Sequence, residues 1–398
     1  MVLDLLKSAH HPTELMAMLK IKFNGEVPKD HKQPLEELAL SMNDRDFCYA
    51  ALNRVSRSFA VVIQQLPQQL KDPVCVFYLV LRGLDSVEDD MTYPADQRLH
   101  LLRTFHEKCY EKGWSIKGVG DSADYRVLLG NFHKVIALFQ SLDKSYQAVI
   151  ADICCQMGNG MADYAERKVN TLHDYNDYCH YVAGLVGIGL SSLFSASGLE
   201  TERLQHETEL ANSMGLLLQK TNISRDYYED LHLGRVFWPR QIWGKYADKL
   251  EEFHDKPTSP ESLACINEMV TNALEHVSNC ILYLQLIQDK QVFRFCAIPQ
   301  VMAMATLAKI YNNPDVYVEV VKIRKGIAAK MMVGTKDMDS VKKYMERFVE
   351  DIRSKLNTED PNYTLTKKRL NRIIEALDDV TYGKSLPAER SVEETVLF

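Results

Sequence analysis

The sequence predicts an all-α fold, and three observations support that prediction. Of its 398 residues 46% are hydrophobic, so the chain can bury a large core. Glycine accounts for 18 of 398 residues, about 4.5%, which is below the usual level near 7%. The alternation of apolar and polar residues that half-buried strands require is scarce. Helices are therefore expected throughout.

Helices are expected in order along the chain, separated by turn signals. The predicted segments are about Asp46–Gln65, Asp72–Met91, Ala95–Glu111, Ser122–Leu142, Ser145–Lys168, Leu172–Ser197, Gln205–Asp230, Pro239–Tyr246, Ser259–Leu286, Pro299–Tyr311 and Arg324–Val333. Predicted breaks include Pro67, Asp72-Pro73, Tyr93-Pro94, Gly198, Gly234, Pro257 and Pro314. No linker interrupts this run, so residues 1–335 are expected to form one all-helical domain. Two charged helices should follow within 336–383, and 384–398 resembles a linker-like tail.

Composition and charge exclude several classes of protein. The net charge is −7 and no basic stripe is interleaved with aromatic residues, so no nucleic-acid partner is expected. The nine cysteines form no C-x-x-C pair and are expected to be reduced core residues. The N-terminus is too soon charged for a secretory signal. The glycine-rich run Val182–Leu199 has no charge, but it suits a close-packed internal helix better than a membrane span.

One acidic signature, D-x-x-E-D, occurs twice in the sequence. The first copy is Asp85-Ser-Val-Glu88-Asp89 and the second is Asp226-Tyr-Tyr-Glu229-Asp230. Residues four apart on a helix share a face, and like charges there repel. Paired carboxylates of this kind suit a divalent cation, and Mg²⁺ prefers oxygen ligands that include substrate phosphates. A diphosphate is therefore the first substrate class to consider.

Polar and cationic neighbours accompany both copies. Tyr78 and Arg82 share the helix face of Asp85 and Asp89. The second copy has Gln219, Asn222 and Arg225 beside it in the same way. The alternative is that both are solvated acidic helix faces. Two copies with matching companions make that alternative the weaker one.

Four further groups have possible chemistry. Ser56-Arg57-Ser58-Phe59 offers hydroxyls and a guanidinium to phosphate oxygens, although it could be an ordinary helix start. Tyr181 stands beside small residues that admit a second backbone or a slender apolar ligand. The aromatic run Phe293–Gln300, with a proline expected to break or start a helix, could be packing alone. Lys322, Arg324 and Lys325 suit an anionic cofactor, although most short basic runs are solvated surface.

Taken together, these strings resemble the squalene synthase family, which couples two farnesyl diphosphates head to head. The matching strings occur in the family's order between about residues 45 and 335. They are V-S-R-S-F at 55–59, V-F-Y-L-V-L-R-G-L-D-S-V-E-D-D at 76–90, Y-C-H-Y-V-A-G-L-V-G at 178–187, L-Q-K-T-N-I-S-R-D-Y-Y-E-D at 218–230, R-V-F-W-P at 235–239, F-C-A-I-P-Q at 295–300 and V-K-I-R-K-G at 321–326.

The resemblance implies a single isoprenoid-synthase helical domain with a central cavity, a transferase activity and the cofactors Mg²⁺ and NADPH. The implied metal ligands are Asp85, Glu88, Asp89, Asn222, Asp226 and Asp230, and the implied catalytic residues are Tyr181, Asp85, Asp89, Asp226 and Asp230. Substrate would be bound by Ser56, Arg57, Ser58, Phe59, Tyr78, Arg82, Gln219, Arg225, Phe295, Cys296 and Pro299. Cofactor phosphate would be held by Lys322, Arg324 and Arg235.

In the implied reaction, two farnesyl diphosphates give presqualene diphosphate, which NADPH reduces to squalene. The family also implies a monomer at the endoplasmic reticulum membrane, with the catalytic domain facing the cytosol. The apolar ending Val-Leu-Phe398 would fit a chain cut at the start of a C-terminal anchor.

Two alternatives remain open at this point. A phytoene- or dehydrosqualene-type synthase needs no hydride donor, and the F-C-A-I-P-Q and K-I-R-K-G strings argue against it. A non-catalytic isoprenoid-binding relative would be expected to lose metal carboxylates or Tyr181, which this chain keeps.

Overall fold

The computed structural model describes residues 33–381 except positions 57 and 166. Helices and their connections account for all of this part of the chain, and no strand occurs in it. The predicted all-α class is confirmed. The predicted tail 384–398 and Arg57 lie outside the described residues.

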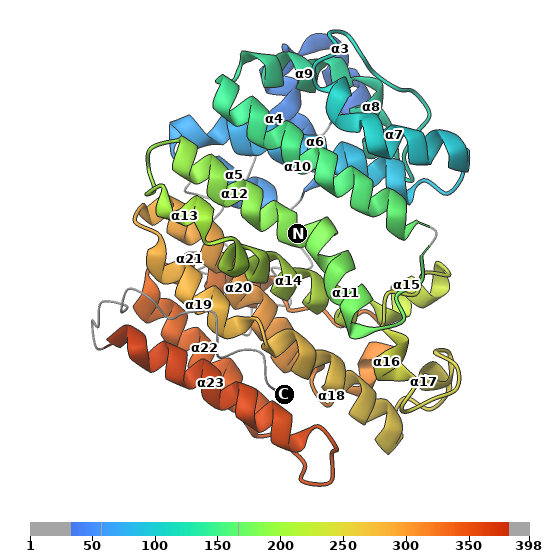
Figure 1. Cartoon of the computed structure of the whole chain (residues 1–398), viewed down its shortest axis with the longest axis vertical. Coiled ribbons are helices and arrows are strands. Elements are labelled where there is room, and N and C mark those ends of the chain that lie inside the picture. Colours follow the sequence, from blue (N-terminus) through green and yellow to red (C-terminus); the bar gives the residue numbers. More distant parts are fainter. Residues whose placement is uncertain (1–32, 57, 166, 382–398) are drawn as a thin grey trace.

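The N-terminal half forms the upper part of the molecule in Figure 1. Its helices are α3 (Leu35–Ser41), α4 (Asp44–Val55), α5 (Ser58–Gln64), α6 (Gln68–Asp89), α7 (Ala95–Lys108), α8 (Ala123–Gly130), α9 (Phe132–Ser141) and α10 (Lys144–Tyr164). Helices α6 and α10 pack against each other and against α7. All three lie in the upper part of the molecule in Figure 1.

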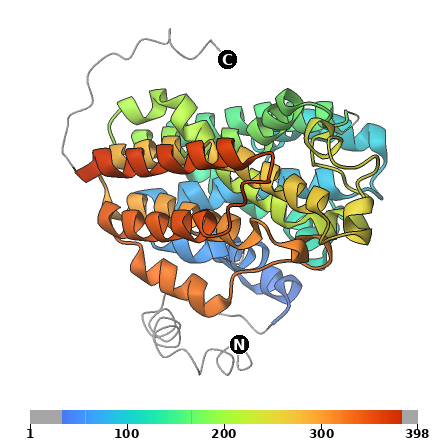
Figure 2. The same ribbon diagram turned by 90° about the horizontal axis from the view of Figure 1, so that it is seen from below.

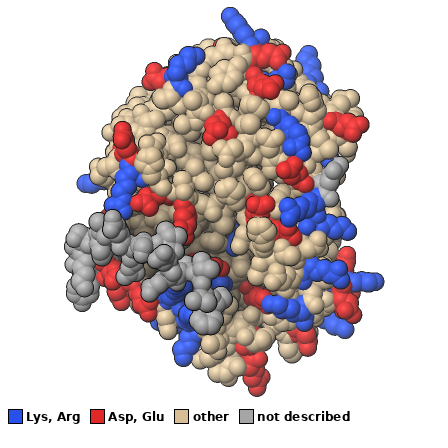
Figure 3. All heavy atoms as spheres, in the orientation of Figure 1, with Lys and Arg blue, Asp and Glu red and all other residues tan. Residues whose placement is uncertain are grey.

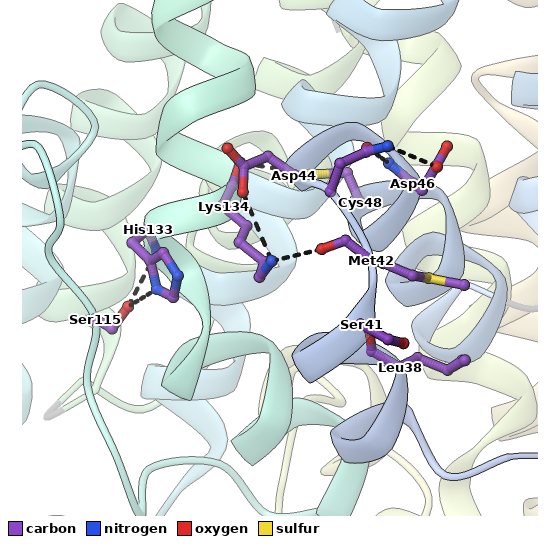
Figure 4. A network of polar contacts seen from close by, with 10 residues as sticks. Leu38, Ser41, Met42, Asp44, Asp46, Cys48, Ser115, His133 and Lys134 are labelled. Carbon is purple, nitrogen blue, oxygen red and sulfur yellow. Dashed lines mark hydrogen bonds and ion pairs between the residues drawn. The ribbon is translucent and has the colours of Figure 1, made fainter.

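A polar network ties α9 to the junction of α3 and α4 (Figure 4). Lys134 Nζ donates to the Met42 carbonyl at 2.8 Å and lies 3.7 Å from the Asp44 carboxylate. Asn43 caps α4 by accepting from the Asp46 N–H at 2.8 Å. The last carbonyls of a helix have no intrahelical donor, so this lysine satisfies one of them while it joins two helices.

The remaining helices form the middle and lower parts of the molecule (Figure 1). They are α11 (Leu172–Cys179), the π-helix η1 (His180–Gly184), α12 (Leu185–Ala196), α13 (Arg203–His206), α14 (Thr208–Arg225), α15 (Tyr227–His232), α16 (Arg240–Trp243), α17 (Glu252–Asp255), α18 (Pro260–Leu274), α19 (Val277–Leu286), α20 (Lys290–Ile310), the 3₁₀ helix η2 (Pro314–Tyr317), α21 (Lys325–Gly334), α22 (Met338–Arg353) and α23 (Tyr363–Thr381). Helix α14 lies at the centre and packs against α12, α18, α19 and α20.

The two charged C-terminal helices lie side by side along the lower face, as Figure 2 shows. Helix α22 packs on α20, and α23 packs on α18 and α19. Their apolar faces, with Val341, Met345, Ile352, Leu370 and Ile373, belong to the same continuous core as the preceding helices. On the face drawn in Figure 3, acidic and basic side chains are interspersed over the surface.

Two prolines lie inside helices where the sequence predicted breaks, so both predictions are wrong. Helix α6 begins at Gln68 and runs through Pro73, and α20 begins at Lys290 and runs through Pro299. Each proline removes one intrahelical hydrogen bond. The long buried faces of both helices offset that loss, because nearly every turn contributes core residues.

Several predicted helices are divided. The segment Asp46–Gln65 is split after Val55, and Ser122–Leu142 is split at Asn131, whose φ of −120° is not helical. The segment Ser259–Leu286 ends its first helix at Leu274 and restarts at Val277. The segment Gln205–Asp230 comprises α13, α14 and α15. In each case apolar periodicity continues across a short backbone bend, so the pattern alone does not reveal the division.

The small residues after Tyr181 bring two backbones together. A Cβ on Gly187 would lie 2.1 Å from the Ala211 carbonyl oxygen, and one on Gly215 would lie 2.0 Å from the Ala183 carbonyl oxygen. Glycine is therefore required for α14 to approach η1 and α12. Of the two partners expected for this run, the structure shows the second backbone, and Val182, Ala183, Val186 and Gly187 of the same run also line an apolar cavity.

Two helical stretches are long and apolar enough to span a membrane by length and composition. They are Leu172–Ala196, of which 39% of the most apolar window is buried, and Lys290–Ile310, of which 78% is buried. Both line the interior of the bundle, and core helices of soluble proteins pass the same test.

Candidate active site

The two D-x-x-E-D segments face each other across one cavity of about 350 Å³. Helix α6 supplies one wall, and α14 with α15 supplies the other. The polar residues that line this cavity, named here the acidic cavity, are Arg82, Asp85, Glu88, Asp89, Tyr178, Gln219, Asn222, Asp226, Asp230 and Arg235. All six residues predicted as metal ligands are thus brought together, although up to 145 positions separate Asp85 from Asp230.

On α6, a cation is held beside the carboxylates as the sequence predicted. Arg82 Nη1 lies 3.2 Å from Asp85 Oδ2, and the guanidinium lies between the rings of Tyr78 and Tyr125, 5.7 and 5.6 Å from their centroids. Arg82 Nη2 also donates to the Tyr78 hydroxyl at 3.4 Å. The aromatic rings hold the guanidinium by cation–π attraction and fix its direction.

The second acidic segment lies at a helix junction and not on one continuous helix. Asp226 ends α14 and precedes α15, with φ −93° and ψ 14°. The helical spacing nevertheless persists, since the Asp226 N–H donates to the Asn222 carbonyl and the Asp230 N–H donates to the Asp226 carbonyl, both at 2.9 Å. Asn222, Asp226 and Asp230 therefore still lie one above another, as the i, i+4 spacing predicted.

The electrostatics of the acidic cavity favour a bound cation. Burial, together with the charge of Asp89, raises the pKa of Asp85 to about 6, although Arg82 opposes this shift. Burial and the neighbouring Asp226 raise the pKa of Asp230 to about 7. Burial also raises the pKa of Glu88 and of Asp89. Burial is the main cause of these raised pKa values and the neighbouring carboxylates add to it, so a bound cation would stabilise the ionised form of each carboxylate.

The donor set fits a magnesium ion that retains other ligands. Among residues 33–381 apart from 57 and 166, no three His, Cys, Asp or Glu side chains converge on one point closely enough to chelate a bare ion. Mg²⁺ is commonly bound through one or two carboxylates, with water and substrate phosphate completing its shell. A few carboxylate and amide oxygens around a cavity with room for water and phosphate match this type of coordination.

An apolar cavity of about 270 Å³ adjoins the acidic one. The two cavities share Arg82, Asp85, Val182, Gln219 and Asn222 in their walls. Beyond those residues the wall is mainly hydrocarbon and aromatic, and Gln300 adds one amide. The apolar and aromatic side chains include Phe59, Phe77, Tyr78, Val186, Leu190, Phe194, Met214, Tyr283, Phe295, Cys296 and Pro299. The predicted substrate residues Phe59, Tyr78, Phe295, Cys296 and Pro299 all lie here.

A smaller apolar cavity of about 160 Å³ continues on the other side of Phe59 and Pro299. Arg225, Asn222, Met302 and Met332 are among the residues that line it. Met332 belongs to α21, the helix that begins at Lys325, the last residue of the basic segment Lys322–Lys325. The smaller cavity thus has walls from both α14 and α21.

Some predicted site residues lie elsewhere. Ser56 is buried and donates to the Leu52 carbonyl at 2.6 Å, so it ends α4 and does not line a cavity. The Ser58 side chain is not among those described. Lys322 and Arg324 are exposed and lie outside the three cavities. Arg235 pairs with Asp89 at 3.1 Å in the acidic cavity and does not join the Lys322 segment.

Tyr181 does not line the cavities, although it directly precedes Val182, which does. It falls in the π-helix η1, and its ring packs so closely on α10 that a Cβ on Gly160 would lie 2.1 Å from its Cγ atom. Tyr181 lines neither the acidic nor the apolar cavity, whereas Tyr178 and Val182 do. A π-helical turn carries an extra residue, so side chains beyond it are displaced relative to an α-helix.

Tyr178 is a functional candidate that the sequence reasoning missed. It is buried, stacks on Phe237 at 5.3 Å between ring centroids, and lines the acidic cavity. Burial and the nearby Glu88 raise the pKa of its hydroxyl, which therefore stays protonated and can donate a hydrogen bond. Its place four residues before Val182 is a helical spacing that could have revealed it.

A helical bundle in which an acidic cavity adjoins an apolar one defines the class of protein as an all-α enzyme that acts on an isoprenoid substrate. Residues 52–326 match the profile described as squalene/phytoene synthase. The chain belongs to the squalene/phytoene synthase family.

Comparison with similar proteins identifies the type of enzyme within this family. A squalene synthase from Nicotiana benthamiana is 49% identical over 372 residues, covering 93% of this chain and 88% of its own. One from Rattus norvegicus is 44% identical over 374 residues, with the same two shares. In structure, the complex of TcSQS with the ligand E5700 has a TM-score of 0.83 and 45% identity, covering 84% of this chain and 98% of that one. The function shown is a transferase of the squalene synthase type, and the phytoene-type and non-catalytic alternatives are not favoured.

Proposed function

We propose that the joined cavities condense two molecules of farnesyl diphosphate to presqualene diphosphate and then reduce it to squalene with NADPH. The observation that carries this proposal is the shared wall of Arg82, Asp85, Gln219 and Asn222, where an acidic cavity opens into an apolar one. A molecule with a diphosphate head and a long hydrocarbon tail matches both environments at once.

At the acidic end, the chain's own residues would hold and orient the diphosphate. Arg82 and Arg225 supply guanidinium groups, which suit phosphate oxygens, and Tyr178 supplies a hydroxyl donor. Asp85, Glu88, Asp89, Asn222, Asp226 and Asp230 would hold Mg²⁺, which when bound neutralises the charge of the departing diphosphate. The raised pKa values of Asp85 and Asp230 support this assignment.

At the apolar end, the walls would fold the hydrocarbon chains and exclude water. Phe194 and Phe295 meet edge to face with 6.0 Å between centroids, and both line the cavity. A carbocation that forms there must not meet water, which would quench it to an alcohol. Tyr181 would help the proton lost on closing the cyclopropane ring to leave, after a shift of its ring toward the cavity.

The cofactor would be held by Lys322 and Arg324, which precede α21 and are exposed. NADPH, when bound, supplies the hydride of the second step. The continuity of the small apolar cavity from Met332 to Asn222 supports a route from that surface to the reacting carbon. Arg235, paired with Asp89, would act at the acidic end instead.

We further propose that the protein acts as a monomer at the endoplasmic reticulum membrane with its site facing the cytosol. All nine cysteines are free thiols, which suits a reducing compartment. Membrane fractionation with protease protection tests this location, and protection of the site from external protease in sealed vesicles would contradict it.

The experiment that tests the reaction is incubation with farnesyl diphosphate and Mg²⁺, with and without NADPH, followed by product identification. Presqualene diphosphate without NADPH, and squalene with it, are the expected products. A product with no cyclopropyl intermediate, or no requirement for NADPH in squalene formation, would contradict the proposal.

A further inference from the structure

Gln300 is a buried side chain in the wall of the apolar cavity with one half of its amide unpaired. It is 2% exposed, and its Nε2 donates to the Met214 carbonyl at 3.1 Å. This bond fixes the amide orientation, because a flipped amide would set two oxygens against each other. Within the described part of the chain, no donor reaches Oε1. An unpaired buried acceptor lowers stability, so its retention calls for an explanation.

A complementary unpaired donor belongs to the opposite end of the same cavity. Among the described residues that line it, only Arg82 Nε and Gln300 Oε1 are buried side-chain atoms without a partner. Gln300 is held at Met214, eight residues before Asn222 on α14, or about 12 Å along the helix at 1.5 Å per residue. A donor thus marks the diphosphate end and an acceptor marks the hydrocarbon end.

The residue before Gln300 affects a second acceptor in the same cavity wall. Pro299 lies inside α20 and has no N–H, so the carbonyl of Phe295 loses its usual partner one turn later. Phe295 and Pro299 both line the cavity. The wall of α20 therefore has the unpaired side-chain acceptor of Gln300 and, one turn before it, a backbone carbonyl that lacks its usual intrahelical donor. Carbonyl dipoles fixed in an apolar setting stabilise positive charge strongly, because water does not screen them.

We propose that the Gln300 side-chain carbonyl stabilises the carbocation that forms in the apolar cavity. The inference rests on the proposed function. When the bond between carbon and the diphosphate oxygen breaks, the electron pair leaves with the diphosphate toward Arg82, and the positive charge stays on the hydrocarbon. Gln300 then interacts more strongly with the cation than with the neutral substrate, so its contribution falls on the chemical step.

The first test is Gln300→Met, which keeps length and volume but removes the dipole. We expect kcat to fall by about tenfold or more while KM for farnesyl diphosphate stays unchanged. Tm should stay unchanged or rise, because an unpaired acceptor is removed with one hydrogen bond. Gln300→Leu repeats the test should the first variant fail to fold.

The matched control is Gln147→Met. Gln147 is also 2% exposed, but it bonds the Gln140 and Leu142 carbonyls, accepts from Lys144, and lines none of the three cavities. This change should lower Tm and leave kcat of the folded protein intact. A purely structural Gln300 would behave like Gln147, and that outcome would overturn the inference.

Binding gives a test that needs no turnover. Calorimetry would compare an ammonium analogue of the farnesyl cation with its neutral hydrocarbon isostere, each with inorganic diphosphate and Mg²⁺. The wild-type protein should prefer the ammonium analogue, and Gln300→Met should lose about tenfold of that preference. An unchanged preference refutes the role of Gln300. Wild-type protein that makes no presqualene diphosphate refutes the proposed function, which is a separate result.

Discussion

Arg225 and Asp226 are adjacent in the sequence and form a two-point ion pair, with Nε 2.7 Å from Oδ1 and Nη2 2.5 Å from Oδ2. The guanidinium thereby occupies both oxygens of a carboxylate that the acidic motif offers to a metal. A cation that binds Asp226 would compete with Arg225 for this carboxylate, and a released Arg225 would be able to turn to the anionic substrate. One exchange of partners would couple metal binding to diphosphate binding.

Replacing one carboxylate of either acidic segment should abolish catalysis without harming the fold. Asp85→Asn and Asp226→Asn should each slow diphosphate release roughly 100-fold or more, since charge stabilisation of a leaving group is often worth about 3 kcal/mol per group. Diphosphate release at saturating Mg²⁺ measures this. Asp163→Asn, which breaks the exposed ion pair with Arg103 at 2.6 Å, is the control and should retain normal rates. Near-normal release by either site variant would contradict the account.

The stability of the metal-free protein should fall as pH rises from about 4 to 7. The ordinary aspartate pKa is 3.8, whereas that of Asp85 is about 6 and that of Asp230 about 7 in the folded chain. Over this window the folded state binds more protons than the unfolded state, so the free energy of unfolding decreases with pH. Mg²⁺ competes with those protons and should raise Tm more at pH 8 than at pH 5.5. Thermal unfolding with and without Mg²⁺ checks both trends.

The variant Asp85→Asn gives a more specific test of the pH dependence of stability. With one buried charge removed, the metal-free variant should be more stable than wild type at pH 8 and should show a smaller shift with Mg²⁺. Equal Mg²⁺ shifts at both pH values, or a variant with an undiminished shift, would show that these carboxylates do not hold the ion.

The sequence predicted the residues of the acidic site better than the helix geometry that positions them. Asn222 and Asp230 line the acidic cavity together because i, i+4 hydrogen bonds persist through the bend at Asp226. The same cavity includes Asp85 and Asp89 of α6. The bend itself leaves no mark in the pattern, since helical periodicity continues across it.

The differences between the predicted and the observed structure have specific causes. Pro73 and Pro299 were read as breaks because local propensity disfavours proline in helices, but burial of whole helix faces outweighs one lost hydrogen bond. Tyr178 was missed although its helical spacing from Val182, which also lines the acidic cavity, could have revealed it. The unpaired Oε1 of Gln300 arises from tertiary packing and has no signature in the sequence.

Tyr181→Phe should keep the fold and block formation of presqualene diphosphate, because only a hydroxyl is lost. Gly160→Ala offers an independent approach, since a Cβ there would lie 2.1 Å from Tyr181 Cγ and must push the ring away. Both variants should show the same loss when intermediates are quantified without NADPH. A folded Tyr181→Phe variant that still makes the intermediate at a normal rate would give Tyr181 a packing role only.

The double variant Lys322→Ala/Arg324→Ala should separate the two half-reactions. Each lost charge-assisted hydrogen bond should cost about 1.5–3 kcal/mol, or roughly 10- to 150-fold in cofactor affinity. Presqualene diphosphate should accumulate at modest NADPH, and squalene should recover as NADPH is raised. Product analysis across an NADPH titration checks this. Loss of both products together would mean that the basic segment does not serve the reductant.

The central claim, that both acidic segments hold metal and diphosphate together, is tested most directly by crystallography with manganese. Crystals grown with Mn²⁺ and a non-hydrolysable farnesyl thiodiphosphate would reveal the ions by anomalous scattering. The account predicts ions between α6 and the α14–α15 junction, ligated by Asp85 or Asp89 on one side and by Asn222, Asp226 or Asp230 on the other, with Arg225 turned from Asp226 to the diphosphate. Ions bound elsewhere, or a diphosphate outside the acidic cavity, would contradict it.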